Sequence, residues 1–262
     1  KLFCQGPQLQ KTTAGPVPFP YRLARSTSTQ PRNVMLQRLR AIAILSLFCA
    51  ACQSAPRIPS DATSLLPPSS LDGWVGGSTF DPGDLADSGE EKRSAKLSEW
   101  TTAAKEHWRV EGEELVSDGH GPHLVTAKDY GDFELWLDWK LLPNGDSGIY
   151  LRGYPQVQLW DPANEREWGN GSDKGSGALW NNQTHERFPL ALADVPAGEW
   201  NEMYVKLKGD VVTVELNGQL VVDEVVLENY FHRDQAIRAR GPIHLQTHGS
   251  ETRFRNLYLR EL

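Results

Sequence analysis

The sequence predicts an all-β domain, an antiparallel β-sandwich with one short helix, over residues 71–262. Three observations predict it. Short segments alternate apolar and polar residues at a period of two, turn signals separate them, and only one stretch has helical spacing. Such segments are typical of two packed antiparallel sheets, each with one buried and one solvated face.

The elements follow one another with recognisable breaks. A strand and turn are expected at 71–80, a polar loop at 81–89 and the helix at 92–107, where apolar residues recur every three or four positions. Asn217-Gly218 predicts a two-residue hairpin, because both residues tolerate positive φ. The remaining predicted strands are 108–116, 122–127, 132–141, 147–153, 156–160, 177–181, 200–208, 211–216, 219–223, 242–247 and 252–260.

Alternation also predicts which side chains share a face. Within 132–161 the solvated positions are Trp136, Asp138, Tyr150, Arg152, Gln156, Gln158 and Trp160. Rings stack on sugars, and amides and charges bond their hydroxyls, so this composition favours a carbohydrate ligand. We expect Gln158, His244, Gln246 and Arg152 on one open face, and Val157, Leu159, Ile243 and Leu245 between the sheets.

The first 52 residues differ in charge from the rest. They hold seven Lys and Arg and no Asp or Glu, which leaves 20 basic and 34 acidic residues for the remainder. This asymmetry indicates a leader followed by an acidic mature protein. An acidic domain argues against nucleic acid and anionic membrane surfaces as partners.

Residues 35–52 have the pattern of a signal peptide. Arg38 and Arg40 precede an apolar run at 41–51, and the run ends in Ala-Ala-Cys. This end is lipobox-like, so Cys52 is the expected lipidation site and the protein an exported lipoprotein of the cell envelope. Ordinary cleavage with full secretion is the alternative.

The segments on either side of this signal show no periodicity. We interpret residues 1–34 as mis-annotated upstream translation or a disordered extension, and the Pro- and Ser-containing residues 53–70 as a flexible tether. All three cysteines, Cys4, Cys49 and Cys52, precede the tether. Disulfides, thiolate catalysis and Cys-based zinc sites are therefore excluded from residues 53–262.

A series of motifs in order resembles the 3-keto-disaccharide hydrolase domain family, formerly a domain of unknown function. The resemblance covers residues 71–262. It is carried by GWVGG at 73–77, HWRVEGEELVSDG at 107–119, DYGDFELWLDWK at 129–140, DSGIYLRG at 146–153, PQVQLWDP at 155–162, GALWNN at 177–182, PAGEWNEMYVKLKGDVVTVELNG at 196–218, VLENY at 226–230 and GPIHLQTHGSETRFRNLYLREL at 241–262.

The resemblance implies a concanavalin/laminin-G-like antiparallel β-sandwich (jelly roll). It also implies cleavage of glycosidic bonds in 3-keto-glycosides, by a hydrolase or an elimination-type lyase. The family usually has Asn-Ser-Gly where this chain has Asp146-Ser147-Gly148. The sequence shows no nicotinamide- or flavin-binding signature, so a sugar 3-dehydrogenase upstream would have to supply the ketone.

Such chemistry needs a base for the acidic C2 proton, a stabiliser for the enolate and a donor to the leaving group. His248 is the first candidate acid or base, since imidazole titrates near neutral pH; a structural hydrogen bond is its alternative. Arg152 suits an oxyanion, or else forms a salt bridge to Asp138 or Glu134. Asp161 either acts as a base, orients His248 or caps a turn.

The candidate substrate-binding residues are Asp146, Tyr150, Gln158, Trp160, Trp180, His244 and Gln246. The alternative for each tryptophan is a place in the core. The sequence requires no cofactor and identifies no metal ligands, although Asp81, Asp84 and Asp146 could hold calcium, which takes oxygen ligands.

Two other classes of protein fit the same pattern. A non-catalytic carbohydrate-binding module would share the polar-aromatic groove but would need no titratable group converging with Arg152. A laminin-G-like adhesion domain would carry calcium at a loop rim and have no deep groove.

Overall fold

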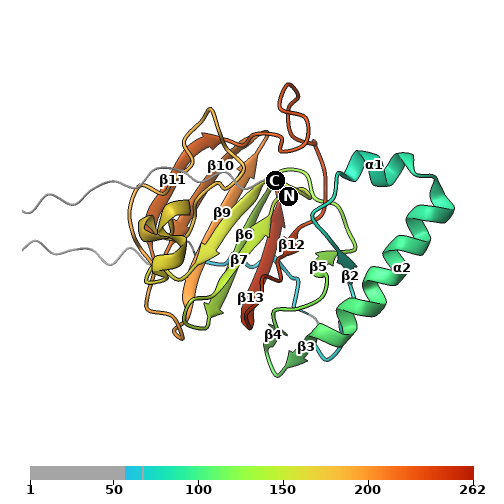
Figure 1. The fold of residues 1–262 in the computed structure, drawn as a ribbon, viewed down its shortest axis with the longest axis horizontal. Helices are drawn as coiled ribbons and strands as arrows, with labels where there is room; N and C mark the ends of the chain where they lie inside the picture. Colours follow the sequence, from blue (N-terminus) through green and yellow to red (C-terminus); the bar gives the residue numbers. More distant parts are fainter. Residues whose placement is uncertain (1–56, 67) are drawn as a thin grey trace, which may run out of the picture. The chain divides into compact units, whose positions relative to one another are not determined.

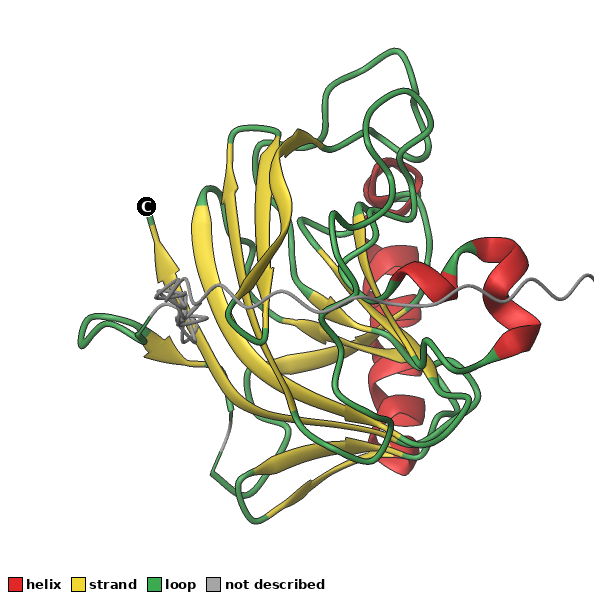
Figure 2. Ribbon diagram, turned by 90° about the vertical axis from the view of Figure 1, so that its left-hand side faces the viewer, coloured by secondary structure: helices red, strands yellow, loops and turns green. Residues whose placement is uncertain are grey.

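The computed structural model describes residues 57–66 and 68–262, which form two antiparallel sheets packed face to face (Figures 1 and 2). The predicted β-sandwich is thus confirmed. The expected upstream segment 1–34, the signal peptide 35–52 and the lipidation site Cys52 lie outside the described residues. No helix in the described part of the chain is long and apolar enough to cross a membrane.

The larger sheet has eight strands in the order β11-β10-β9-β6-β13-β4-β3, with β1 paired to β13. The long strands β6 and β13 lie at its centre, where each pairs on both sides. Its strands are β1 (Thr63–Ser64), β3 (Trp108–Glu111), β4 (Glu114–Ser117), β6 (Phe133–Leu141), β9 (Asn201–Lys208), β10 (Val211–Leu216), β11 (Gln219–Val226) and β13 (Thr252–Glu261).

The smaller sheet has five strands in the order β2-β5-β12-β7-β8. Its strand β12 is only two residues long but pairs with β5 on one side and β7 on the other, and so joins the two halves of the sheet. The strands are β2 (Trp74–Gly77), β5 (His123–Thr126), β7 (Asp146–Tyr150), β8 (Gln156–Trp160) and β12 (His244–Leu245).

The core lies between the sheets and confirms the predicted inward face. The side chains of Val157, Leu159, Ile243 and Leu245 are buried in one apolar cluster with Leu135 and Leu137 of β6. Each fully buried side chain of this kind contributes about 1.5–3 kcal/mol relative to an exposed one. Because the period of a strand is two, burying these residues places their neighbours Gln156, Gln158 and Gln246 on the outer face of the sheet. The prediction that this face is open and solvated is wrong, since loops cover it and all three side chains are buried.

The structure has more helix than the single short helix expected. α2 (Glu90–His107) begins two residues earlier than predicted, and α1 (Pro82–Asp87) replaces the predicted loop at 81–89. Asp81 caps α1 by accepting from Gly83 N at 2.8 Å, with Pro at the first helical position. α2 covers the free edge of β2, where Gly76 N donates to Thr101 Oγ1 at 3.1 Å.

Several predicted strands are interrupted by residues with positive φ. The segment 108–116 is a hairpin of β3 and β4 turning at Gly112 (φ 63°), and β7 ends at Tyr150 because Arg152 (φ 51°) and Gly153 (φ 102°) leave the extended region. The predicted strand 177–181 is only an isolated bridge, Val157 to Leu179. The Asn217-Gly218 hairpin is confirmed, with φ of 51° and 75°.

Part of the predicted tether is structured. Within 53–70, Thr63–Ser64 forms β1 and pairs with Tyr258 and Leu259 of β13. The Trp74 indole donates to Leu65 O at 2.9 Å. The sandwich therefore includes residues that precede the predicted boundary at 71.

Candidate functional site

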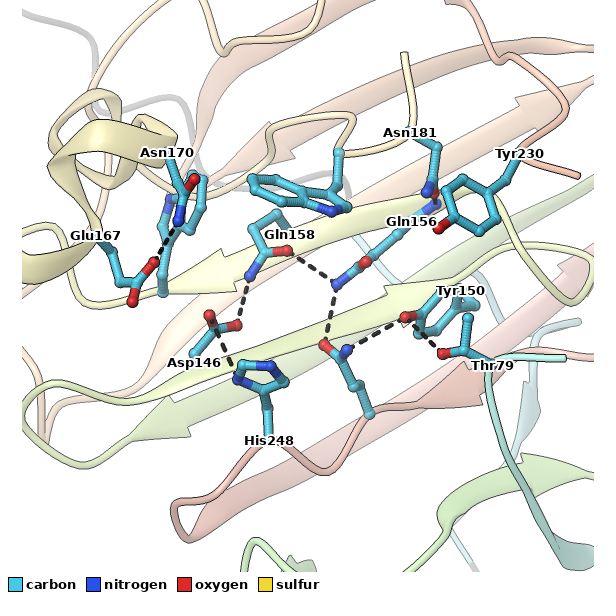
Figure 3. Close-up of a pocket in the computed structure, with 13 residues that line it drawn as sticks. Thr79, Asp146, Tyr150, Gln156, Gln158, Glu167, Asn170, Asn181, Tyr230 and His248 are labelled. Atoms are coloured by element: carbon cyan, nitrogen blue, oxygen red, sulfur yellow. Dashed lines mark hydrogen bonds and ion pairs between the residues drawn. The ribbon is translucent and has the colours of Figure 1, made fainter. Parts of the chain in front are cut away.

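A pocket of about 280 Å³ lies on the outer face of the five-stranded sheet, over β7 and β8 (Figure 3). Its size is near the lower end of the range of about 300–1,000 Å³ for ligand sites. The segment 78–80, the loops after β8 and β11, and the turn after β12 complete it. Thirteen residues line it: Thr79, Asp146, Tyr150, Gln156, Gln158, Trp160, Glu167, Asn170, Trp180, Asn181, Tyr230, Gln246 and His248.

Three glutamine amides form the floor as one hydrogen-bonded ladder. Gln156 Nε2 donates to Gln158 Oε1 and to Gln246 Oε1, both at 2.9 Å. Gln158 Nε2 donates to Asp146 Oδ1 at 2.6 Å, and Gln246 Nε2 donates to the Tyr150 hydroxyl at 3.2 Å. The ladder spans β8, β7 and the end of β12, so it fixes the side chains before any ligand arrives.

Gly148 makes room for this ladder. A Cβ at Gly148 would lie 2.1 Å from Gln156 Nε2, so no larger residue fits there without displacing the amide. The backbone adds to the arrangement, because Gln246 N donates to Gly148 O at 2.9 Å. The glycine that follows Asp146-Ser147 is therefore required by the close packing of the Gln156 amide.

Asp146 and His248 form the titratable pair of the pocket. Asp146 Oδ2 lies 3.5 Å from His248 Nδ1, and the imidazole is 58% exposed whereas the carboxylate side chain is 18% exposed. Burial raises the pKa of Asp146 to about 6; His248 and Gln158 oppose this effect, and the negative charge of Glu167 adds to it. A carboxylate with this pKa titrates close to the working range of a general base.

The turn that carries His248 is tied to the loop before β5. Thr247 Oγ1 donates to Gly121 O and Gly249 N donates to Gly119 O, both at 2.8 Å. Gly249 adopts φ 79°, which a residue with a Cβ rarely takes. These contacts hold the imidazole beside Asp146, at the start of β7.

Aromatic rings form one wall, but not as the sequence predicted. Trp160 is 2% exposed and its indole donates to Gly175 O at 2.7 Å, so it supports the wall from behind. Trp180 packs edge to face on it at 5.8 Å and carries the Arg187 guanidinium 4.2 Å from its ring. Tyr230 is 43% exposed, so Trp180 and Tyr230 are the accessible rings of the pocket.

Glu167 and Asn170 reach the pocket from a 3₁₀ helix, η1 (Glu165–Asn170). Asn170 Nδ2 donates to Glu167 Oε2 at 2.6 Å. Figure 3 shows both residues toward the same end as Asp146 and His248, with Asn181, Tyr230 and Thr79 at the other end. One end of the pocket is therefore ionisable and the other neutral.

Asp161 is not among the residues that line the pocket. Its carboxylate accepts from Asn144 N at 2.8 Å and Ala163 N at 3.0 Å, and its carbonyl accepts from Asn164 N. It thus caps the turn that leads from β8 into η1. This is the turn-capping alternative from the sequence, and it places Asp161 as a support for the segment that carries Glu167.

Arg152 is wrongly placed by the sequence analysis. Its side chain is 2% exposed and bonds Asp132 Oδ1 at 2.7 Å and the carbonyls of Gly131, Gly209 and Arg238 at 2.8, 2.6 and 3.2 Å. The predicted parity fails because the positive φ of Arg152 breaks the strand just before this position. Its ion-pair partner is also neither Asp138 nor Glu134, the two predicted.

His244 lies on the predicted face but outside the pocket lining. Its ring packs 5.6 Å from Tyr150 and 6.2 Å from His123, behind the wall that Tyr150 forms. Burial lowers the pKa of His244 to about 3 and that of His123 to about 4. Both rings are therefore neutral at physiological pH and support Tyr150.

The structure brings no metal-binding group together within the residues it describes, where no three His, Cys, Asp or Glu side chains could hold an ion. Asp81 caps α1 and lies 2.8 Å from His232 Nε2. Asp84 belongs to the first turn of α1, and Asp146 is paired with His248. Two of the three candidate calcium ligands, Asp81 and Asp146, are thus engaged with other partners, and Asp84 is exposed on α1.

Five lining residues were not singled out by the sequence, namely Thr79, Glu167, Asn170, Asn181 and Tyr230, and Gln156 was named there only as an outward position. Only Gln156 had a usable signal, since it shares the parity of Gln158. The others come from loops and a 3₁₀ helix, where no periodicity predicts direction. Tyr230 lies in the loop after β11, where Glu228 accepts from the backbone of residues 183–185.

Comparison with known proteins identifies relatives of this architecture. A family model described as the 3-keto-alpha-glucoside-1,2-lyase-like domain matches residues 61–260. No curated protein matches the chain.

Two crystal structures of candidate glycosyl hydrolases from Parabacteroides distasonis ATCC 8503 are similar to the chain. One has 23% sequence identity and a TM-score of 0.55, and the match covers 77% of this chain and 94% of that one. The other has 25% identity and a TM-score of 0.50, covering 60% and 91%. Both likenesses show a shared fold.

Proposed function

The chain belongs to the 3-keto-alpha-glucoside-1,2-lyase-like domain family, and from this premise we propose that it cleaves glycosidic bonds of 3-keto-glycosides. Family membership and the glycosyl hydrolase-like relatives support a carbohydrate-related function. The proposal that 3-keto-glycosides are the substrates depends on one observation. The Asp146–His248 pair lies beside a fixed amide ladder in a pocket of about 280 Å³.

The pair supplies the base. When His248 Nδ1 carries the proton and points it at Asp146, Nε2 keeps a lone pair for the C2 proton of the sugar. The ketone at C3 makes that proton acidic, because the electron pair of the broken C2–H bond passes to the ketone oxygen as an enolate. Asp146 holds the ring in this tautomer and stabilises the imidazolium that forms.

Neutral donors at the other end of the pocket suit the enolate and the hydroxyls. The Tyr150 hydroxyl accepts from Gln246 and can accept from Thr79 Oγ1 at 3.1 Å, which leaves its own proton for a ligand oxygen. Burial raises the pKa of Tyr150, so the phenol keeps that proton at neutral pH. Asn181 Oδ1 accepts from Gln156 N at 2.8 Å, which orients its amide at the rim.

Elimination follows from collapse of the enolate. The C1–O bond breaks, a C1–C2 double bond forms, and the leaving oxygen takes the proton that the imidazolium or a water donates. Addition of water across the double bond, with OH to C1 and H to C2, completes a net hydrolysis. Release before that addition makes the enzyme a lyase, and both outcomes use the same base.

A second candidate, an ordinary glycosidase, is favoured by one observation. Asp146 and Glu167 both line the pocket, and burial raises the pKa of Asp146 as required of a general acid. A pocket that only binds sugars, as in a carbohydrate-binding module, is the third candidate.

One panel separates the three candidates. The purified protein is incubated with 3-keto-glucosides and with the matching unoxidised glucosides, in H₂O and in D₂O. Cleavage of the 3-keto compounds alone, with deuterium at C2, is the expected result. Comparable cleavage of the unoxidised glucosides would establish the ordinary glycosidase, and binding without any turnover would establish the binding module.

The sequence also supports a proposal on location and supply. We infer that the mature chain begins at Cys52, carries lipid and faces the exterior of the membrane, where a sugar 3-dehydrogenase provides the ketone. Intact-mass analysis of membrane-fraction protein should find an acylated N-terminal Cys52. A mature chain with an unmodified Cys52 would contradict the anchor.

A further inference from the structure

The charges of the pocket have one sign. Of its thirteen lining residues, Asp146 and Glu167 carry carboxylates and no Lys or Arg is present among them. His248 Nδ1 lies 3.5 Å from Asp146 Oδ2, so the imidazole is already paired with one of these carboxylates. A ligand therefore meets negative charge that no lining cation is free to balance.

Two arginines contact residues that line the pocket: Arg233 is hydrogen-bonded, and Arg187 stacks on a ring with its Nε lacking a hydrogen-bond partner. Arg233 donates to Asn181 O and to Glu228 Oε2, the latter at 3.2 Å. Arg187 lies on the Trp180 ring with its guanidinium carbon 4.2 Å from the centroid. Neither arginine lines the pocket. An acidic ligand would find no fixed fork of donors of the kind that recognises carboxylates.

Glu167 is held in place by its own segment. Its carbonyl accepts from Gly171 N at 3.1 Å, and its carboxylate accepts from Asn170. Asn164 caps η1 by accepting from Arg166 N at 3.3 Å, and Ser172 Oγ donates back to Asn164 O at 3.2 Å. The carboxylate is thus a positioned feature of the pocket, with Asn170 as its donor.

We propose that the pocket selects neutral sugars over anionic ones such as uronic acids, with Glu167 as a specificity-determining residue. This proposal rests on the proposed function for its substrates but not for its physical basis. A sugar carboxylate that lies at the ionisable end of the pocket approaches Asp146 and Glu167, and one at the other end meets only neutral lining residues. Repulsion between like charges at short range in a partly desolvated site raises the free energy of the bound anionic sugar. We expect this to lower kcat/KM for the anionic sugar by about tenfold to a hundredfold relative to the neutral one.

The test uses two substrates that differ only at C6, a methyl 3-keto-glucoside and the matching methyl 3-keto-glucuronide. We expect kcat/KM to be at least about tenfold higher for the neutral compound. The ratio should shrink as salt is raised from 50 mM to 500 mM, because screening weakens the repulsion. Equal kcat/KM for the two, or a preference for the uronide, would overturn the proposal.

Variants assign the effect to Glu167. In Glu167→Gln the ratio should fall about threefold to tenfold, and in Glu167→Lys it should fall further, through faster cleavage of the uronide. Glu165→Gln is the matched control, since Glu165 lies on the same helix but does not line the pocket. Its ratio should stay within about twofold of the wild type.

Binding distinguishes failure of this proposal from failure of the proposed function. Calorimetric titration with the unoxidised glucoside and glucuronide needs no turnover. A weaker affinity for the glucuronide that Glu167→Gln relieves would support the selection even if no 3-keto compound is cleaved. An unchanged ratio in Glu167→Gln, or loss of all cleavage of the neutral substrate in that variant, would contradict it and make Glu167 structural or catalytic.

Discussion

The outer faces of the two sheets contain similar residues and differ in what their charges do. On β6 of the larger sheet, Glu134 accepts from Arg260 at 2.8 Å and from the Tyr204 hydroxyl at 2.7 Å, and Asp138 accepts from Arg255 at 2.9 Å. On the smaller sheet, Asp146 has amide and imidazole partners and no guanidinium.

This difference shows what distinguishes a functional polar face from a stabilised one. The carboxylates of β6, Glu134 and Asp138, are paired with the permanently charged guanidinium groups of Arg260 and Arg255. Asp146 is desolvated without such a partner, and its pKa is raised to about 6 by that burial. Perturbed groups in a concave site are typical of catalytic residues.

The contrast between the two faces would be wrong if a carboxylate on the larger sheet mattered as much for activity as Asp146 on the smaller one. Asp146→Asn and His248→Gln should each lower kcat by about 10²–10⁴-fold on a 3-keto-glucoside, because a positioned acid or base contributes that much. Asp138→Asn on β6 is the control and should change kcat less than about threefold. Steady-state kinetics measure all three, and full activity in both pocket variants would remove the pair from the mechanism.

Arg152 lies two residues after β7, the strand that carries Asp146, but it stabilises the fold and does not line the pocket. We expect Arg152→Met to lower the free energy of unfolding by about 3 kcal/mol, since Asp132 and three carbonyls lose their donor. Urea denaturation measures this. At temperatures where the variant is folded, kcat should stay within about threefold of the wild type; a loss like that of His248→Gln would return Arg152 to the site.

The stability of the two faces should respond oppositely to loss of a carboxylate. The folded-state pKa of Asp146 is above its ordinary value of 3.8, so its contribution to stability is present at low pH and lost as pH rises through about 6. Asp146→Asn, neutral throughout, should therefore be more stable than the wild type by about 3 kcal/mol at pH 8 and equal to it near pH 3.

Chemical denaturation at the two pH values tests this sign. Asp138→Asn should be no more stable than the wild type at pH 8, because its ion pair with Arg255 is lost. If Asp146→Asn destabilises the protein at pH 8, the carboxylate is better satisfied than its burial indicates.

The smallest effect is expected at the half-exposed arginine of the larger sheet. Arg255 pairs with Asp138, and its side chain is 36% exposed. Arg255→Gln should change the free energy of unfolding by about 1 kcal/mol and leave kcat unchanged, since the half-exposed guanidinium contributes little while Asn256 still donates to Asp138. A larger loss would mean that the buried Asp138 carboxylate depends on Arg255 to balance its charge.

The alternation at period two determined by itself that Gln158 and Gln246 face outward while Leu159 and Leu245 enter the core. The alternation also determined most strand positions, and the Asn217-Gly218 pair determined the hairpin between two of them. These properties are local, because a strand alternates and a turn requires positive φ whatever surrounds them.

Only the tertiary structure decided which outward faces meet. Asp138 and Gln158 follow the same pattern within thirty residues of sequence, yet β6 and β8 belong to different sheets. Parity also failed at Arg152, where one residue with φ 51° redirected the chain into a buried network. Glu167 and Asn181 entered the pocket from segments without periodicity, so their direction depends on long-range packing and hydrogen bonds. A local pattern specifies a face, whereas a site needs faces and loops that only the folded chain brings together.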